Sequence, residues 1–159
     1  MKQAVAGAIA LIASTLAVHA AEKAPGEVEF DEYGAIAESL TGVPGDPVRG
    51  REIVSDKSLG NCVACHAAEA LADVPWHGEI GPMLDGAGSR WGEPELRGIV
   101  ANAKMMFDGT MMPAFYKTDG FIRPGDAYTG DPAPDDLPPI LNAQQIEDVV
   151  AYLLTLKDD

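Results

Sequence analysis

The sequence predicts one all-α domain with long loops, and three observations support that prediction. Three segments carry a helix-start signal or an apolar stripe at helical spacing. Between them Gly, Pro and Asp recur every few residues, which is typical of loops and turns. No run of alternating apolar residues indicates a sheet. At 159 residues the chain is long enough for one hydrophobic core but short for two.

The first twenty residues have the pattern of an export signal. Residues 4–18 are almost wholly apolar or small and follow a lysine, and Val18-His19-Ala20 supplies a small-residue cleavage site. Glu22 and Lys23 end the apolar stretch too early for a membrane-spanning helix, which needs about 20 apolar residues. We therefore expect a cleaved signal peptide over residues 1–20, a periplasmic location and no membrane anchor.

The charge balance limits the partners of the chain. The formal net charge is −14 at neutral pH. A field of that sign repels phosphate backbones, so nucleic-acid binding is not expected. The acidity either steers the protein toward basic partner surfaces or only keeps it soluble, and composition does not decide between these interpretations.

The helical part begins after an irregular extension. Residues 21–45 mix charges, Pro and Gly without a period of 3.6 or 2, so we place the domain itself at residues 46–159. Asp46-Pro47 is a helix-start signal, because the Asp side chain can accept from free amides of the first turn and Pro fits the first helical position. It predicts a first helix over residues 47–57.

Two further helices follow. Glu93-Pro94 repeats the start signal and predicts a helix over residues 94–104. Asn142, with Gln145 three positions later, predicts the cap of the last helix. The apolar stripe of that helix consists of Ile146, Val149, Val150 and Leu153.

Gly50 lies inside the first predicted helix, where Gly costs up to about 1 kcal/mol relative to Ala. Such a position invites a packing explanation. A bare backbone there would let the first and last helices cross closely, with Tyr152 as the natural partner.

Cys62-Val63-Ala64-Cys65-His66 is the motif that decides the chemistry. Two thiols three positions apart can each add to a vinyl group of one haem, and the next residue offers an imidazole to its iron. A structural disulfide, a redox-active dithiol and half of a zinc site are the competing interpretations. A zinc site requires more Cys or His residues at short spacing. A redox-active dithiol usually occurs in an α/β fold, and a structural disulfide gives His66 no role. We predict one haem c attached at Cys62 and Cys65, with His66 as an axial ligand.

We expect Met112 as the second axial ligand, because a thioether stabilises reduced iron in electron-transfer cytochromes. Pro113 holds Met112 extended in a loop, and the distance along the chain from His66 is ample to circle the haem. Met111 is the alternative. His77 as a ligand would lower the reduction potential, but a surface or hydrogen-bonding role is the simpler interpretation.

The other methionines after the motif have different expected roles. Met105 and Met106 end the second predicted helix, and we expect them to fill gaps in the core. Met83 follows His66 too closely for an easy route to the other haem face.

Neighbours of the haem and of its ligands can also be predicted. A ligating imidazole usually donates its other ring N–H to a carbonyl, and the carbonyl of Pro82 is free to accept from His66. Arg90 and Trp91 could pair with haem propionates, because a guanidinium and an indole N–H are good carboxylate donors. An ordinary surface Arg and a core Trp are the alternatives.

With these residues in place, the chain resembles the SoxX family, the monohaem subunits of the SoxAX cytochromes of bacterial thiosulfate oxidation. The haem motif and Gly81-Pro82 are shared by many class I cytochromes c and indicate only that superfamily. Two segments are more particular to the family, Met112-Pro113-Ala114-Phe115-Tyr116-Lys117 and residues 143–153. The resemblance also runs through residues 40–47, 50–54, 60–66, 80–84 and 96–97.

The resemblance implies the class I cytochrome c fold, with three main helices and long loops around one covalent haem, and the axial pair His66 and Met112. It further implies a heterodimer with SoxA, which bears the active-site haem, in an L-cysteine S-thiosulfotransferase. That enzyme joins thiosulfate oxidatively to a cysteine of the SoxYZ carrier. On this interpretation the chain supplies no catalytic residue and passes electrons to a downstream acceptor.

One segment departs from the family pattern, the acidic and Pro-rich residues 125–136. Two other functions stay open beside the electron-transfer subunit. The chain could be a free-standing class I cytochrome c that shuttles electrons, or a disulfide-stabilised binding protein without haem.

Overall fold

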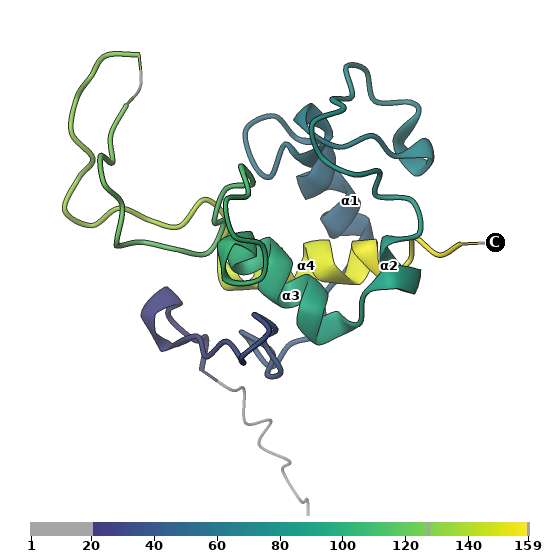
Figure 1. The fold of residues 1–159 in the computed structure, drawn as a ribbon, viewed down its shortest axis with the longest axis horizontal. Coiled ribbons are helices and arrows are strands. Elements are labelled where there is room, and N and C mark those ends of the chain that lie inside the picture. The colour runs from purple at the N-terminus through teal and green to yellow at the C-terminus, as the bar shows by residue number, and fades with distance from the viewer. Residues whose placement is uncertain (1–20, 127, 159) are drawn as a thin grey trace, which may run out of the picture.

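The computed structural model describes residues 21–126 and 128–158 (Figure 1). The predicted signal peptide, residues 1–20, lies outside the described residues. The α-helices are α1 (Pro47–Ser55), α2 (Ala87–Arg90), α3 (Glu93–Asn102) and α4 (Ala143–Leu153). Short 3-10 turns occupy Pro25–Glu27, Cys62–Ala64, Glu69–Leu71 and Ala103–Met105. In the described part of the chain the only pairing of β type is an isolated bridge between Gly125 and Pro132.

Helix α1 starts as predicted and ends earlier. The Asp46 carboxylate accepts from the amides of Val48 and Arg49, which lack partners within the helix. The predicted end at residue 57 is wrong, because Asp56 already has an extended backbone and its carboxylate binds the Ser58 amide instead. An Asx turn of this kind competes with helix continuation.

Helix α3 has a different cap from the expected one. Gly92 is the N-cap and makes no side-chain cap bond, while Glu93 is the first helical residue and pairs with Arg97 one turn later. The α-helix ends at Asn102, and Ala103–Met105 continues as a 3-10 turn. The helix predicted over roughly residues 94–104 is therefore present, and its bounds differ by one residue at the start and two at the end.

Helix α4 confirms the predicted cap and stripe. Asn142 accepts from the Gln145 amide, and the Gln145 side chain accepts from the Asn142 amide. All the residues of the predicted apolar stripe, Ile146, Val149, Val150 and Leu153, are buried.

Helices α1 and α4 cross at the centre of the molecule, and Gly50 explains how closely they meet (Figure 1). A Cβ at Gly50 would lie 1.9 Å from the carbonyl oxygen of Asp148 and 2.8 Å from the Cβ of Tyr152. The predicted packing of Gly50 on α4 beside Tyr152 is confirmed. Gly45 approaches the Glu147 carbonyl in the same way, at 2.0 Å from the position of a Cβ.

The irregular extension contributes to the same core as the helices. Ile36 and Leu40 are fully buried among apolar residues of α1, α3 and α4. The buried Arg97 guanidinium bonds the Glu147 carboxylate at 2.9 Å and the Ile36 carbonyl at 2.9 Å. Glu147 in turn accepts from the Leu40 amide at 2.7 Å. A buried ion pair between α3 and α4 therefore holds the extension.

A long segment, residues 117–126 and 128–140, projects from the helical body (Figure 1). Residues 119–126 and 128–132 are all exposed to solvent. Asp126 accepts from the amides of Tyr128 and Thr129, which gives the segment a turn of its own. Among the helices of the described residues, none has the length and apolar character needed to cross a membrane.

Candidate haem site

The motif that ends at His66 forms a tight turn directly after α1. Asn61 precedes the turn with φ of 47°, a left-handed conformation that Asn tolerates better than most residues. The amides of Cys65 and His66 both bond the Cys62 carbonyl, at 3.1 and 2.9 Å. Both cysteines are free and partly buried, so the turn presents two thiols and the imidazole within one compact unit.

The environment of Cys62 argues against a redox-active dithiol. Burial raises the pKa of the Cys62 thiol to about 12. A disulfide oxidoreductase needs the opposite, a cysteine whose pKa is lowered so that the thiolate attacks. A thioether bond to a haem places no such demand on a buried sulfur once the bond is formed.

A loop from Gly78 to Leu84 lies against the haem-binding turn. Three backbone hydrogen bonds join the two segments, Gly78 N–H to Val63 O at 2.8 Å, Gly81 N–H to Cys65 O at 2.8 Å and Leu84 N–H to Ala67 O at 2.9 Å. The approach is too close for side chains, since a Cβ at Gly78 would lie 2.0 Å from the Ala64 oxygen. A Cβ at Gly81 would lie 2.3 Å from Cε1 of His66. No local sequence pattern predicts this close packing at either glycine.

This loop orients the His66 ring. Nδ1 of His66 lies 2.7 Å from the carbonyl oxygen of Pro82, so the predicted hydrogen bond is confirmed. A carbonyl oxygen can only accept, so Nδ1 is the donor of this bond, and Nε2 is the ring nitrogen left to face a metal. The ligand role of His66 itself stays a prediction.

Arg90 has protein partners that the sequence did not indicate. Its guanidinium donates to the carbonyls of Asp85 at 2.7 Å and Met83 at 2.9 Å. These bonds brace the far end of the loop that carries Pro82. Trp91 is half-buried and meets Phe107 edge to face, with ring centroids 6.0 Å apart. Pairing of Arg90 and Trp91 with propionates stays a prediction.

The methionines after the motif differ in burial. Met112 is half-buried against the hydrophobic core, whereas Met111 is 79% exposed and Met83 50% exposed. Nζ of Lys104 donates to the Met112 carbonyl at 2.5 Å and fixes the backbone of this loop, a contact that no sequence signal indicates.

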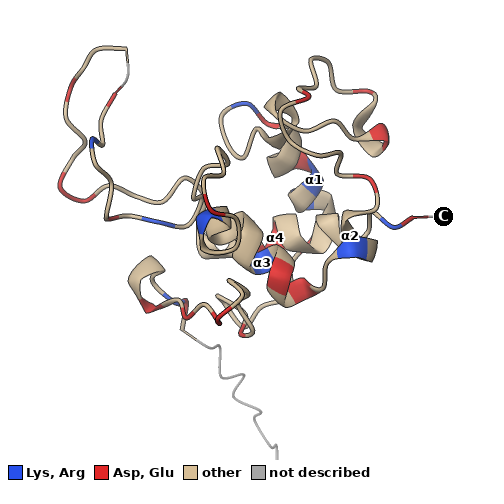
Figure 2. Cartoon of the chain, in the orientation of Figure 1, with Lys and Arg blue, Asp and Glu red and all other residues tan. Residues whose placement is uncertain are grey.

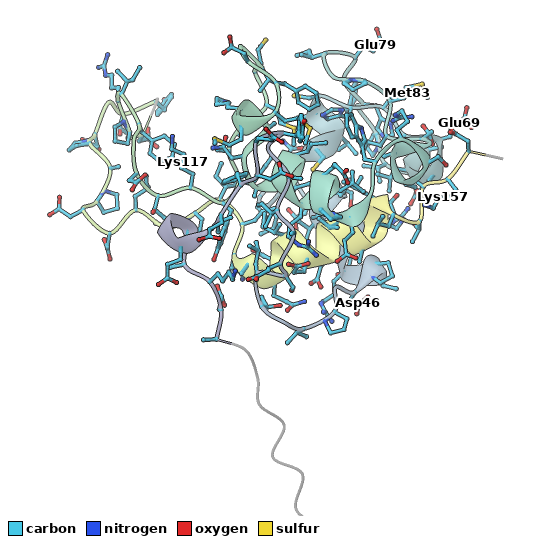
Figure 3. All side chains as sticks on the ribbon, turned by 60° about the horizontal axis from the view of Figure 1, so that its bottom comes forward. Asp46, Glu69, Glu79, Met83, Lys117 and Lys157 are labelled. Carbon is cyan, nitrogen blue, oxygen red and sulfur yellow. The ribbon has the colours of Figure 1, made fainter. Side chains whose placement is uncertain are left out.

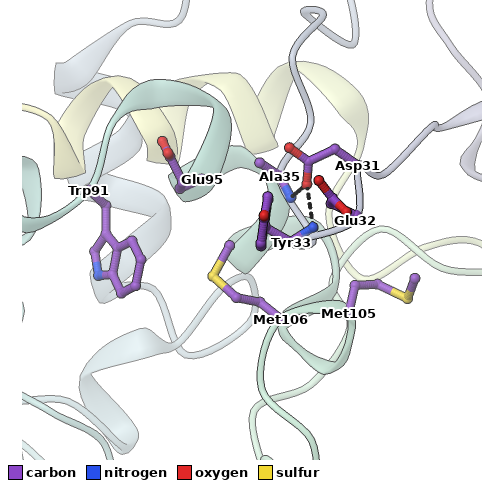
Figure 4. Close-up of a pocket in the computed structure, with 8 residues that line it drawn as sticks. All are labelled: Asp31, Glu32, Tyr33, Ala35, Trp91, Glu95, Met105 and Met106. Carbon is purple, nitrogen blue, oxygen red and sulfur yellow. Dashed lines mark hydrogen bonds between the residues drawn. The ribbon is translucent and has the colours of Figure 1, made fainter.

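Met105 and Met106 do not fill core gaps as predicted. Met105 is 51% exposed because the helix has already changed to a 3-10 turn at this point. Both residues line an open cavity of about 450 Å³ between the extension and the start of α3 (Figure 4). Its walls are formed by Asp31, Glu32, Tyr33, Ala35, Trp91, Glu95, Met105 and Met106.

Comparison with known proteins identifies the family. The cytochrome c family model matches residues 47–157, which include the haem motif and helices α1, α2, α3 and α4. The chain belongs to the cytochrome c family. It is 62% identical to a chain of the crystal structure of SoxXA from P. pantotrophus, with a TM-score of 0.82, and the match covers 86% of this chain and 99% of that chain. No curated protein sequence matches the chain.

These similarities confirm the all-α class I cytochrome c fold, the resemblance to the SoxX family and covalently bound haem c as the cofactor. The residues fit that cofactor, because the turn offers two free thiols and the bond from Nδ1 of His66 to Pro82 leaves Nε2 as the ring nitrogen available to the iron. When bound, haem c supplies one-electron chemistry.

Proposed function

We propose that this chain is the electron-transfer subunit of a SoxAX-type L-cysteine S-thiosulfotransferase in the periplasm. In that reaction a sulfur–sulfur bond forms between thiosulfate and a cysteine of the SoxYZ carrier, and two electrons and one proton are released. The partner subunit SoxA holds the site where sulfur reacts, and the present chain accepts electrons and passes them on.

The observation that carries the proposal is the similarity to a chain of SoxXA, at 62% identity and over nearly the whole length of that SoxXA chain. A match confined to the haem motif would support only a cytochrome of unspecified role. Here the match extends well beyond the haem motif, since it covers 86% of this chain.

We also propose His66 and Met112 as the axial pair. The Pro82 bond supports His66, since it leaves Nε2 available, and burial against the core supports Met112 over the exposed Met111. A side chain that is already packed loses less conformational entropy when it binds.

The residues of the chain act by holding the cofactor rather than by catalysis on sulfur. Cys62 and Cys65 attach it, and Pro82 fixes the plane and tautomer of the His66 ring. The backbone bonds from Gly78, Gly81 and Leu84, together with Arg90, hold Pro82 in place. A rigid ligand set changes little between oxidation states, which favours fast electron transfer.

Affinity purification from cells grown on thiosulfate tests the proposal. A tagged form of this chain should recover SoxA together with covalent haem, detected by peptide identification and the pyridine haemochrome spectrum. Recovery of a haem-loaded monomer that exchanges electrons at full rate without SoxA would instead identify a free-standing shuttle.

A further inference from the structure

Trp76 combines two features that rarely occur together. Its side chain is 83% exposed. Its backbone has φ of 71°, a left-handed conformation that side chains of this size seldom adopt and that costs free energy. A turn with positive φ after Pro75 would ordinarily have Gly or Asn at this position.

The residues on either side hold this conformation in place. Gly78 is bonded to the Val63 carbonyl within the haem-binding turn. The His77 ring turns inward, where Nδ1 accepts from the Ala68 amide at 3.4 Å and Nε2 is buried without a hydrogen-bond partner in the described part of the chain. Because its neighbours are anchored in the body, the indole of Trp76 is directed to solvent.

Two further large apolar side chains of the same loop are exposed, and we call the three residues together the Trp76 surface: Trp76, Ile80 and Met83. Ile80 is 69% exposed and Met83 50% exposed, so three large apolar side chains face solvent within eight residues of one loop. Isolated apolar residues are common on surfaces, but three large ones exposed within one short loop make that loop a candidate interaction site.

The rim of the Trp76 surface is acidic. Residues 67–86 contain four carboxylates, Glu69, Asp73, Glu79 and Asp85, and no Lys or Arg. Two guanidinium groups from outside this range reach it, Arg51 at Asp73 and Arg90 at the Met83 carbonyl, so the carboxylates still outnumber the cations. Glu79 and Met83 project outward from this loop region on the same side of the molecule (Figure 3), and acidic residues recur along it (Figure 2). An apolar centre with an acidic rim fits a protein surface that has an apolar pocket bordered by Lys and Arg.

The Trp76 surface is continuous with the site of electron transfer. Pro82, whose carbonyl accepts from His66, lies between Ile80 and Met83 in the same loop. A partner seated here would therefore contact the segment that orients the proposed axial ligand.

We infer that Trp76 is the anchor by which this chain binds its partner cytochrome subunit, inserting the indole into a basic-rimmed apolar pocket of that subunit. The inference rests on the proposed function and names the surface that serves it. Trp is among the residues most often responsible for binding energy at interfaces, because it buries a large rigid area. The strained backbone then has a use, since it keeps the indole exposed for the partner.

The projecting segment offers the competing surface. Tyr128 is 98% exposed and Ile122 fully exposed, and the segment lies on the opposite side of the body from the loops between α1 and α2 (Figure 1). None of its described hydrogen bonds reaches the haem-binding turn. Tyr128 is therefore a matched control, an exposed aromatic residue on a loop.

The test measures the affinity of haem-loaded chains for the purified SoxA subunit by calorimetry. The variants are Trp76→Ala, Trp76→Gly and Tyr128→Ala, each checked for haem content, visible spectrum and melting temperature. Trp76→Gly is included because Gly adopts the observed φ freely and keeps the loop conformation. We expect both Trp76 variants to bind about tenfold or more weakly, with unchanged spectra, and Tyr128→Ala to bind within about twofold of the wild type.

The outcomes separate the two proposals. Failure of the wild-type chain to bind SoxA would contradict the proposed function itself. Wild-type binding that both Trp76 variants retain would overturn only the present inference, as would loss of binding in Tyr128→Ala alone. Self-association of the wild type that Trp76→Ala abolishes would also overturn it, because the surface would then join two copies of this chain.

Discussion

Met112 and Met111 are adjacent in sequence but differ in exposure, and this difference carries a spectroscopic prediction. Replacement Met112→Ala should abolish the weak charge-transfer band near the red edge of the visible spectrum, because no thioether would bind the oxidised iron. The reduction potential should fall, since the thioether stabilises the reduced state. Absorption spectroscopy and redox titration of the haem-loaded variant measure both effects.

Met111→Ala is the matched control, with the same side chain removed one position earlier. Its band and potential should equal those of the wild type. A band that survives in Met112→Ala and disappears in Met111→Ala would assign the ligand to Met111.

For single residues, the sequence predicts those contacts that depend on neighbours close along the chain. The Cys62 to His66 spacing and the free carbonyl of Pro82 can be read directly, and the His66 hydrogen bond is present. The left-handed backbone of Trp76 and the carbonyl partners of Arg90 could not be predicted. Both depend on how the loop that carries Pro82 packs against the haem-binding turn, and no local sequence pattern encodes that packing.

The close crossing of α1 and α4 predicts how one methyl group added at Gly50 changes the stability of the fold. Ala has a helix propensity about 1 kcal/mol better than Gly, so propensity alone would make Gly50→Ala stabilising. The new Cβ would instead lie 1.9 Å from the Asp148 oxygen, and separating two helix backbones costs about 1–3 kcal/mol or more. We expect the melting temperature of the holoprotein to fall by several degrees in calorimetry.

Gly26→Ala provides the comparison, because a Cβ at Gly26 meets nothing within 4 Å. Its melting temperature should stay close to that of the wild type. An increase in stability for Gly50→Ala would show that the helices can move apart at little cost.

Asp148 links the same two helices and makes their contact pH-dependent. Burial alone would raise the pKa of Asp148, but bonds from Arg49, the Asp46 amide and Gln144 hold it below its ordinary value. A carboxylate with a lowered pKa stabilises the fold fully above the pKa of the unfolded state, about 3.9, and loses that contribution as pH falls through the folded value.

Asp148→Asn should therefore be less stable than the wild type at pH 7, with a difference that shrinks below about pH 4. Denaturant unfolding of the holoprotein across this range measures the difference. Asp119→Asn is the control, since the Asp119 side chain is exposed and makes no ion pair in the described part of the chain. A pH-independent difference for Asp148→Asn would contradict the linkage.

The start of an element was easier to predict than its end. Asp46 and Asn142 cap their helices as expected, because a capping side chain acts on amides two or three residues away. The ends of α1 and α3 depend on Ser58 and on the 3-10 turn after Asn102, which form only once the following loops are placed.

For the molecule as a whole, the extension is the part that sequence patterns describe least. Residues 21–45 have no period, yet Ile36 and Leu40 are buried in the core. Besides the bonds to Arg97 and Glu147, the Ile36 amide donates to the Pro94 carbonyl and the Thr41 hydroxyl to the Gln144 side chain. The Tyr116 hydroxyl donates to the Lys23 carbonyl, so the extension is tied at several places. Its attachment is long-range and polar, and hydrophobic periodicity carries no information about contacts of that kind.

The Arg97–Glu147 pair predicts how firmly the extension is held. Both side chains are almost fully buried, so Arg97→Met leaves the Glu147 charge without a cationic partner and should cost about 3–5 kcal/mol. Glu147→Leu should cost less, because Arg97 keeps its ion pair with Glu93. The double variant should lose less than the sum of the two, because no lone charge remains. It should still be less stable than the wild type, since the Ile36 carbonyl and the Leu40 amide lose their partners.

Denaturant unfolding measures the coupling energy between Arg97 and Glu147. Limited proteolysis followed by mass spectrometry reports on the extension. Cleavage within residues 21–45 should accelerate in all three variants. Arg51→Met removes the exposed ion pair with Asp73 and should change stability by less than about 1 kcal/mol without added cleavage. Strict additivity of the two buried replacements would mean that the charges do not depend on each other. Unchanged proteolysis in the double variant would mean that the remaining contacts, among them the burial of Ile36 and Leu40, hold the extension without the bonds of Arg97 and Glu147.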